Sequence, residues 1–346
     1  MRRQSDIAEE RRRRALRNIL TQSMASASSV QMFHTDLFLS CQSGMAITME
    51  LSSLSASTTM VPVLLSQALA STHLRESFDI PIRMAFQPIV DLRSKTVFAY
   101  EALLRGKHGE AAATILRHVT EQNRYAFDNA CRKQSMIQAS QWRVQDGPAR
   151  LAVNVRANIM CSPEACVERT LDLADQLHFP LSKLILEITQ HELLLDYVYL
   201  NHLVEKFRGY GIHTAIDDFG SSHADLTLLA EVETDIVKID MTLVRGLNKN
   251  PSNCLIVESI VQQADRFRIQ VIAEGVETKA EYEVLSRMGV YLMQGYYFAR
   301  PALAHLPPWK APRTSWQSLQ AAPGIRISPC HAESPSAPLK TANMAA

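Results

Sequence analysis

Carboxylate and amide side chains recur at the ends of short apolar runs in the middle of the chain. Glu187 ends Leu-Ile-Leu-Glu, Asp217 and Asp218 end Thr-Ala-Ile-Asp-Asp, and Glu274 ends Val-Ile-Ala-Glu. Apolar runs of this length are typical of buried strands. One polar residue at a strand end would be interpreted as a solvated rim residue or a helix cap. Seven such ends together predict one shared site, and the residues at the other four are Glu101, Asn154, Lys238 and Gln294.

Carboxylates gathered in an apolar setting repel one another, and their pKa values rise unless a cation is present. The cluster therefore predicts a bound metal. Oxygen donors suit Mg²⁺ or Mn²⁺, and the absence of His and Cys from these strand ends argues against zinc. Neighbouring strand residues point to opposite faces. Asp217 and Asp218 can both reach the site only where the strand ends and the chain turns, as Phe219-Gly220 suggests.

An adjacent Asp pair also suggests two ions, one Asp bridging both and its neighbour binding the second. Two ions about 3.5–4 Å apart are a known arrangement for in-line attack at phosphorus, because they activate a bridging water and shield the phosphate charge. Lys238 would hold or polarise that water. The guanidinium of Arg105 suits a phosphate oxygen.

The elements that must position these residues alternate between strand-length apolar runs and helical patterns, which predicts a parallel sheet. About eight strands in about 220 residues favour a closed TIM-type α/β barrel over an open sheet. Asn250-Pro251 and the Thr278/Glu281 pair predict helix starts. The expected strands are Met84–Val90, Val97–Leu104, Arg150–Asn154, Leu184–Ile188, His213–Asp217, Ile236–Ile239, Gln270–Glu274 and Val290–Met293.

Three zones divide the 346 residues. Residues 1–79 are Ser-rich and predict a mostly disordered leader with a short basic helix. Residues 80–306 form the expected barrel domain. Residues 307–346 are rich in Pro and predict a flexible tail. The fold class is thus a TIM-type barrel with flexible N- and C-terminal extensions.

Composition limits the partners. The net charge of +1 leaves no bulk electrostatic attraction for nucleic acid, so neither DNA nor RNA is expected as a partner. The six cysteines are scattered without metal or redox spacing, which indicates buried or idle thiols in a reducing cytoplasm. No apolar stretch reaches the length of a membrane span. We therefore expect a cytoplasmic protein.

The order and spacing of these segments resemble the bacterial EAL-domain family over about 220 residues, and the Glu-Ala-Leu triplet at Glu101 is intact. The matching segments are Phe86-Gln-Pro-Ile-Val90, Glu101-Ala-Leu-Leu-Arg105, Asn154, Glu187-Ile-Thr189, Asp217-Asp-Phe-Gly220, Lys238-Ile-Asp240, Glu274-Gly-Val-Glu277 and Gln294-Gly-Tyr296. The resemblance implies a phosphodiesterase that opens cyclic di-GMP to linear pGpG, in bacterial second-messenger signalling that governs biofilm formation and motility.

The resemblance also implies roles for individual residues. Glu101, Lys238, Glu274 and Gln294 would be catalytic, with Lys238 positioning the water. A homodimer is implied as well. Two ions, Mg²⁺ or Mn²⁺, would be held by Glu101, Asn154, Glu187, Asp217, Asp218 and Glu274. The nucleotide groove would be lined by Gln87, Leu103, Arg105, Asp240, Tyr296 and Pro301.

Some positions depart from the family pattern. Gln190 stands where active members carry a second Glu, the loop Ser221–Asp225 has lost a Gly at Ser222 and a Tyr at His223, and Arg156 replaces a Ser. A degenerate EAL protein that binds cyclic di-GMP or a protein partner without efficient hydrolysis is therefore the alternative hypothesis. An enolase-like lyase would also use carboxylates and Mg²⁺ but does not explain the Asp-Asp-Phe-Gly and Lys-Ile-Asp segments.

Overall fold

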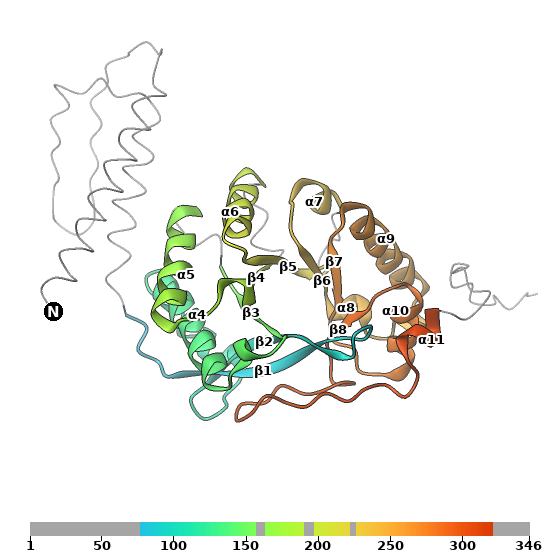
Figure 1. Cartoon of the computed structure of the whole chain (residues 1–346), viewed down its shortest axis with the longest axis horizontal. Coiled ribbons are helices and arrows are strands. Elements are labelled where there is room, and N and C mark those ends of the chain that lie inside the picture. The colour runs from blue at the N-terminus through green and yellow to red at the C-terminus, as the bar shows by residue number, and fades with distance from the viewer. Residues whose placement is uncertain (1–76, 157–162, 190–196, 222–225, 321–346) are drawn as a thin grey trace, which may run out of the picture. The chain divides into compact units, whose positions relative to one another are not determined.

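The computed structural model describes residues 77–156, 163–189, 197–221 and 226–320. Within them, eight strands close into a barrel in sequence order, with helices around the outside (Figure 1). This confirms the predicted fold, and each expected strand is found. The strands are β1 (Ile82–Asp91), β2 (Thr96–Gly106), β3 (Arg150–Asn154), β4 (Leu184–Thr189), β5 (His213–Phe219), β6 (Ile236–Ile239), β7 (Gln270–Ala273) and β8 (Leu292–Met293).

The barrel is not fully parallel, and on this point the sequence interpretation was wrong. Strand β1 runs antiparallel to both of its neighbours, β2 and β8, whereas the pairs from β2 through β8 are parallel. Only residues 92–95 connect β1 to β2. So short a connection makes a hairpin, because a parallel crossover needs a dozen or more residues.

Two helices begin at the starts that local signals predicted. Asn250 caps α9, accepting a hydrogen bond from Asn253 N, and Pro251 follows at the first helical position. Thr278 and Glu281 form a reciprocal capping box on α10. Both predicted starts are confirmed. The α-helices up to β8 are α3 (Ala112–Leu116), α4 (Arg124–Gln141), α5 (Pro163–Leu177), α6 (Tyr197–Gly209), α7 (Leu226–Glu231), α8 (Met241–Val244), α9 (Pro251–Phe267) and α10 (Lys279–Arg287). Short 3-10 turns are η1 (Val144–Asp146), η3 (Leu181–Lys183) and η5 (Leu247–Lys249).

Two apolar clusters hold the barrel together. The larger lies between the strands and the helices. The smaller fills the barrel interior with one residue from each strand, and Phe98 and Tyr291 pack against it. Its members are Ile89, Ala99, Ala152, Ile185, Ala215, Ile236, Ile272 and Leu292. This interior layer is the floor on which the polar site is built.

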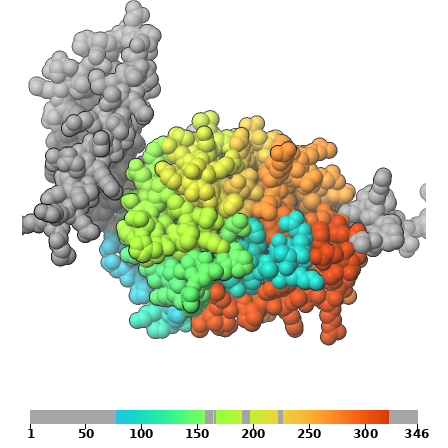
Figure 2. Space-filling model, in the orientation of Figure 1, coloured from blue at the N-terminus to red at the C-terminus, as the bar shows by residue number. Residues whose placement is uncertain are grey.

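The segment after residue 306 is packed on the barrel as far as Gln320, in part as helix α11 (Trp316–Gln320). Trp316 donates a hydrogen bond to Val290 O, and its ring meets Tyr291 edge-on. Gln317 donates to Arg93 O in the β1–β2 hairpin, and Figure 2 shows the cyan hairpin beside the red C-terminal segment. These contacts correct the expected flexible tail for residues 307–320. Trp316 packs on the segment just before β8, and Gln317 binds the β1–β2 hairpin.

Other predictions fall on residues outside the described ranges. They concern the leader up to residue 76, Gln190, the loop positions 222–225 and the tail from residue 321. Among the helices of the described residues, none has both the length and the apolar character needed to cross a membrane.

Candidate metal centre

The polar site is one layer of side chains directly above the apolar floor. Alternate residues of a strand share a face. In β2 to β6, and directly after β7 and β8, a polar residue lies two positions after each floor residue, as Glu187 follows Ile185. In β1, which runs the opposite way, Gln87 precedes Ile89 by two. The layer is completed by Glu101, Asn154, Asp217, Lys238, Glu274 and Gln294.

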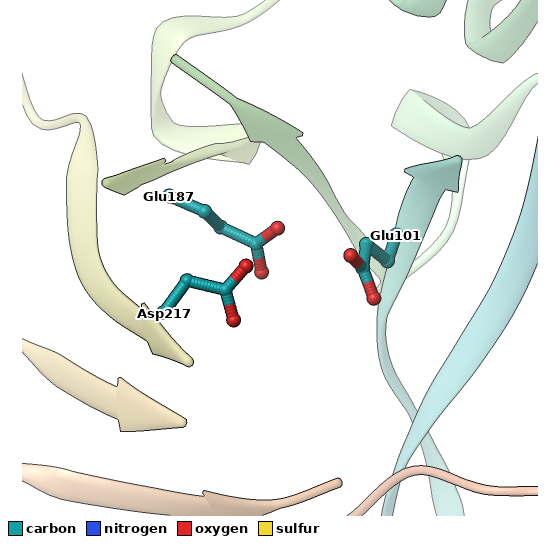
Figure 3. Close-up of side chains that lie close together, drawn as sticks. All are labelled: Glu101, Glu187 and Asp217. Atoms are coloured by element: carbon teal, nitrogen blue, oxygen red, sulfur yellow. The ribbon is translucent and has the colours of Figure 1, made fainter. Parts of the chain in front are cut away.

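Three carboxylates of this layer come from different strands and point toward one another (Figure 3). Glu101, Glu187 and Asp217 each offer an oxygen, and these atoms lie within 4.8 Å of one another. A second group of the same compactness contains Asp217, Asp218 and Glu274. Asp217 belongs to both groups. This sharing is the arrangement expected of a carboxylate that bridges two ions.

Asp218 reaches the site by a different route from the one predicted. Strand β5 does not end at the Asp pair but runs on to Phe219. Its register with β6 shifts between Ile216 and Phe219, and Asp218 adopts a left-handed φ of 55°. Asp218 N donates to Asp217 Oδ1 at 3.0 Å. A bulge within the strand, rather than its end, therefore turns both carboxylates to one side.

Lys238 is the only cation of this layer. Its side chain is 0% exposed, and Nζ lies 3.5 Å from Glu101, 3.0 Å from Glu187, 2.9 Å from Asp217 and 2.8 Å from Glu274. Burial alone would lower the pKa of Lys238, but the surrounding carboxylates, with Asp217 the largest contributor, raise it well above its ordinary value. The ammonium is therefore charged at neutral pH.

The acids have raised pKa values despite this ammonium. Burial raises the pKa of Glu187 and of Glu274 well above the ordinary value; Lys238 opposes that rise, and neighbouring carboxylates add to it. Burial and the charge of Asp217 raise the pKa of Asp218 to about 6. One cation does not balance so many acids. Added positive charge would stabilise their ionised forms.

Three amides complete the layer. Gln294 Nε2 donates to Glu101 Oε2 at 2.7 Å. Asn154 Nδ2 donates to Glu187 Oε2 at 3.4 Å, so the amide oxygen of Asn154 is the atom of this side chain that could bind a cation. Gln87 Nε2 donates to Ala299 O at 3.0 Å. The two amides nearest the carboxylates thus orient Glu101 and Glu187.

These residues fit hard divalent cations. The donors are carboxylate and amide oxygens, the set that Mg²⁺ and Mn²⁺ prefer. Glu187 Oε1 is buried and, although Lys238 Nζ is near, has no hydrogen-bond donor with suitable angles among the described residues. A buried carboxylate oxygen without a donor is costly unless a cation binds it. The predicted ligands are therefore brought together in a form that can hold metal.

The predicted groove residues lie around this layer. Leu103 and Arg105 continue the face of Glu101 along β2. Asp240 caps α8, accepting a hydrogen bond from Thr242 N. Tyr296 is 47% exposed, and the guanidinium of Arg300 stacks on its ring at 4.2 Å.

A return of the chain to β1 fixes the place of Pro301. Ala302 exchanges two backbone hydrogen bonds with Phe86, one residue before Gln87 in β1. Pro301 therefore lies next to β1, although no strand pattern in the sequence indicates this contact.

Sequence analysis missed the contacts that hold the site loops. Glu281, predicted only as a cap, also accepts from Gly246 N at 2.8 Å and so ties α10 to the loop after α8. Gly295 lets the chain after β8 cross the loop after β7, since a Cβ there would stand 2.0 Å from Val276 O. An i, i+4 pair on α4, Asp128 and Arg132, is buried rather than solvated. Of these features, only Gly295 is indicated in the sequence, within the segment Gln294-Gly-Tyr296.

The fold and the site define a class, the barrel proteins with a carboxylate-rich centre at the strand ends. The EAL domain family matches residues 73–301. The chain belongs to the EAL-domain family.

Relatives and solved structures agree with this assignment. An uncharacterized protein of Mycobacterium tuberculosis is 31% identical over 265 residues, which cover 70% of this chain and 42% of that protein. A cyclic di-GMP phosphodiesterase of Pseudomonas aeruginosa is 30% identical over 226 residues, covering 64% of this chain and 38% of the enzyme. The chain thus spans less than half the length of the curated relatives it matches.

Among solved structures, a standalone EAL protein from Vibrio cholerae in its cyclic di-GMP-bound form is 39% identical, with a TM-score of 0.64 over 68% of this chain and 98% of that one. A Klebsiella pneumoniae protein solved with manganese and cyclic di-GMP is 25% identical, with a TM-score of 0.60 over 72% of this chain and 68% of that one.

Proposed function

We propose that this protein is a metal-dependent phosphodiesterase that hydrolyses cyclic di-GMP to linear pGpG. The observation that carries the proposal is the pair of carboxylate groups that share Asp217, set around Lys238. Relatives named cyclic di-GMP phosphodiesterases supply the substrate class. A homodimer stays a prediction.

Two divalent ions, Mg²⁺ or Mn²⁺, would be held by the six ligands predicted from the sequence. When bound, they would supply Lewis-acid activation of a water and charge neutralisation at the phosphate. Glu101 and Glu187 belong to one carboxylate group, Asp218 and Glu274 to the other, and Asp217 to both. The amide oxygen of Asn154 adds a neutral donor beside Glu187.

The chain's own groups orient the reactants. Lys238 Nζ is charged and lies among four carboxylates, so it would hold the attacking water by hydrogen bonding and offset negative charge as the bond to phosphorus forms. Gln294 holds Glu101 in place through its 2.7 Å hydrogen bond. Arg105 would bind a non-bridging phosphate oxygen. The groove around the nucleotide would be lined by Gln87, Leu103, Asp240, Tyr296 and Pro301.

The test is hydrolysis of cyclic di-GMP by the purified full chain, with Mg²⁺ and with Mn²⁺, read out as pGpG by chromatography. Glu101→Ala is the inactive comparison. Glu205→Gln, which neutralises an exposed carboxylate on α6, is the matched control and should keep full activity. Product that requires both metal and Glu101 is the expected result. A folded protein that gives no product with either ion would overturn the proposal.

The alternative function is binding of cyclic di-GMP or a protein partner without efficient turnover. Gln190 and Ser222, which depart from the family pattern, favour it. Replacing Glu187 by Gln separates the two in cells. Loss of an effect on cyclic di-GMP levels in Glu187→Gln supports catalysis, whereas an effect that persists supports binding.

A further inference from the structure

A buried ion pair lies behind the site and takes no part in the proposed chemistry. Asp128 and Arg132, one turn apart on α4, are 3% and 2% exposed, with Arg132 Nη2 2.5 Å from Asp128 Oδ2. Arg132 Nη1 donates to Thr170 Oγ1 on α5 at 2.6 Å. The guanidinium therefore links the two helices that pack beside β3.

Stability alone does not account for this pair. Replacing a buried ion pair by apolar side chains of similar volume is often neutral or stabilising, because desolvation cancels the attraction. The pair also leaves Arg132 Nε buried without a hydrogen-bond partner among the described residues. Fixing a conformation is the better-supported use of such a pair.

The second oxygen of Asp128 indicates which conformation is fixed. Asp128 Oδ1 accepts a hydrogen bond from Arg156 N at 3.1 Å. Arg156 lies two residues after Asn154, and between them Val155 N donates to Glu187 O at 2.8 Å. The backbone that leaves β3 is thus anchored on one side by β4 and on the other by α4.

Asn154 lies directly before this anchored backbone. It is the last residue of β3, and the pairing of β3 with β2 ends two residues earlier, at Ala152. The amide nitrogen of Asn154 is directed at Glu187 Oε2. The amide oxygen of Asn154 can therefore reach a cation only if the backbone of Asn154 keeps its position. Groups that orient metal ligands typically change metal affinity about 10–100-fold.

We propose that Asp128 is a positioning residue for the metal centre. It acts through Arg156 N to hold Asn154, while Arg132 and Thr170 fix the Asp128 carboxylate. The inference rests on the proposed function in one respect, that Asn154 is a metal ligand.

The experiment compares two double variants of similar volume at residue 128, one whose side chain can accept a hydrogen bond from Arg156 N and one whose side chain cannot. Asp128→Asn with Arg132→Met keeps an acceptor for Arg156 N, and Asp128→Leu with Arg132→Met removes it at similar volume. Both remove the two charges together, so no buried charge is left uncompensated. Thr170 Oγ1 keeps its 3.0 Å hydrogen bond to Cys166 O in either variant.

The readout is the Mn²⁺ dissociation constant of the full chain without nucleotide, measured by calorimetry, with thermal unfolding to verify the fold. The Asn variant is expected to bind Mn²⁺ like the unmodified chain, and the Leu variant about tenfold more weakly. The difference should vanish when Asn154→Ala is added to both, because Asp128 then has no ligand to position. Equal affinities in the two double variants would overturn the inference.

A second pair tests the same hydrogen bond without touching the helices, should the core variants fail to fold. Arg156→Pro removes the N–H that Asp128 accepts, and Arg156→Ala keeps it. Weaker Mn²⁺ binding in the Pro variant alone is expected, and equal binding in both overturns the inference. If Asn154→Ala by itself leaves Mn²⁺ binding unchanged, the ligand assignment fails, and the inference with it. Activity measurements are not needed for any of these outcomes, so absence of turnover would count against the proposed function only.

Discussion

Replacing Glu187 by Gln is expected to stabilise the metal-free protein while weakening metal binding. Glu187 is fully buried, and its pKa is raised by burial. One of its carboxylate oxygens lies within 4.8 Å of oxygens of Glu101 and Asp217, which gives a repulsion of at least about 3.5 kcal/mol for each ionised pair at an effective dielectric constant of ~20. The attraction between Glu187 and Lys238 Nζ, 3.0 Å away, amounts to about 5.5 kcal/mol at the same dielectric constant. Repulsion and desolvation together exceed that attraction.

The expected gain in the free energy of unfolding is about 2 kcal/mol without metal. This value includes the cost of burying the amide that Glu187→Gln introduces, because only some of its hydrogen-bonding groups find partners. For a barrel of this size it corresponds to a rise in Tm of about 4–8 °C. Thermal unfolding in EDTA at pH 7.5 measures it. The gain should shrink as the pH falls, because a carboxyl whose folded pKa is raised contributes its stability while protonated and loses it as the pH rises through that pKa. Protonated Glu187 is as neutral as Gln.

Adding Mn²⁺ should reverse the order of the two proteins, since the unmodified chain binds the ion more tightly and gains more from it. Glu205→Gln, an exposed neutralisation on α6, should change Tm by no more than about 1 °C in either condition. A lower Tm for Glu187→Gln in EDTA would refute the reasoning, because it would mean that the carboxylate is net stabilising without a cation.

Three further predictions follow from single contacts. The Mn²⁺ affinity should rise with pH by up to about tenfold per unit below the Asp218 pKa of about 6, and calorimetry on Asp218→Asn should find this dependence reduced. Gly295→Ala places a Cβ against Val276 O and should cost about 1–3 kcal/mol or more by chemical denaturation, with activity lost in parallel; an unchanged midpoint would contradict the crossing. A chain ending at residue 310 loses Trp316 and its contact with Tyr291 and should be about 2 kcal/mol less stable than one ending at residue 320, yet still active at low temperature; equal stability would mean that the C-terminal packing contributes nothing.

The candidate site was largely predictable because the interior of a barrel imposes a simple pattern. Ile185 and Glu187 illustrate it: a side chain two positions after a floor residue must point to the same face, and strand ends meet at one rim. Each polar residue of the layer was accordingly identified from an apolar run or a family motif. Whether those residues hold two ions and turn over a substrate stays a prediction.

Three features could not be predicted, and each depends on contacts between distant segments. The left-handed Asp218 in a bulge of β5 depends on the register with β6. Asp128 and Arg132 have the spacing of a solvated helix pair, and only the packing of α4 against β3 and α5 buries them. Trp316 lies in a Pro-rich stretch, and only the segment just before β8, with Val290 O and the ring of Tyr291, gives it partners.

The sequence by itself determined the strands, the closure into a barrel and the identity of the polar layer, because periodicity and residue type are local properties. Tertiary structure alone decided how the site residues meet: Asp217 is shared between two carboxylate groups, and Lys238 is enclosed by four acids. The physical reason is that electrostatic energy in a buried site depends on distances of a few ångströms between side chains far apart in the chain, which no local pattern specifies.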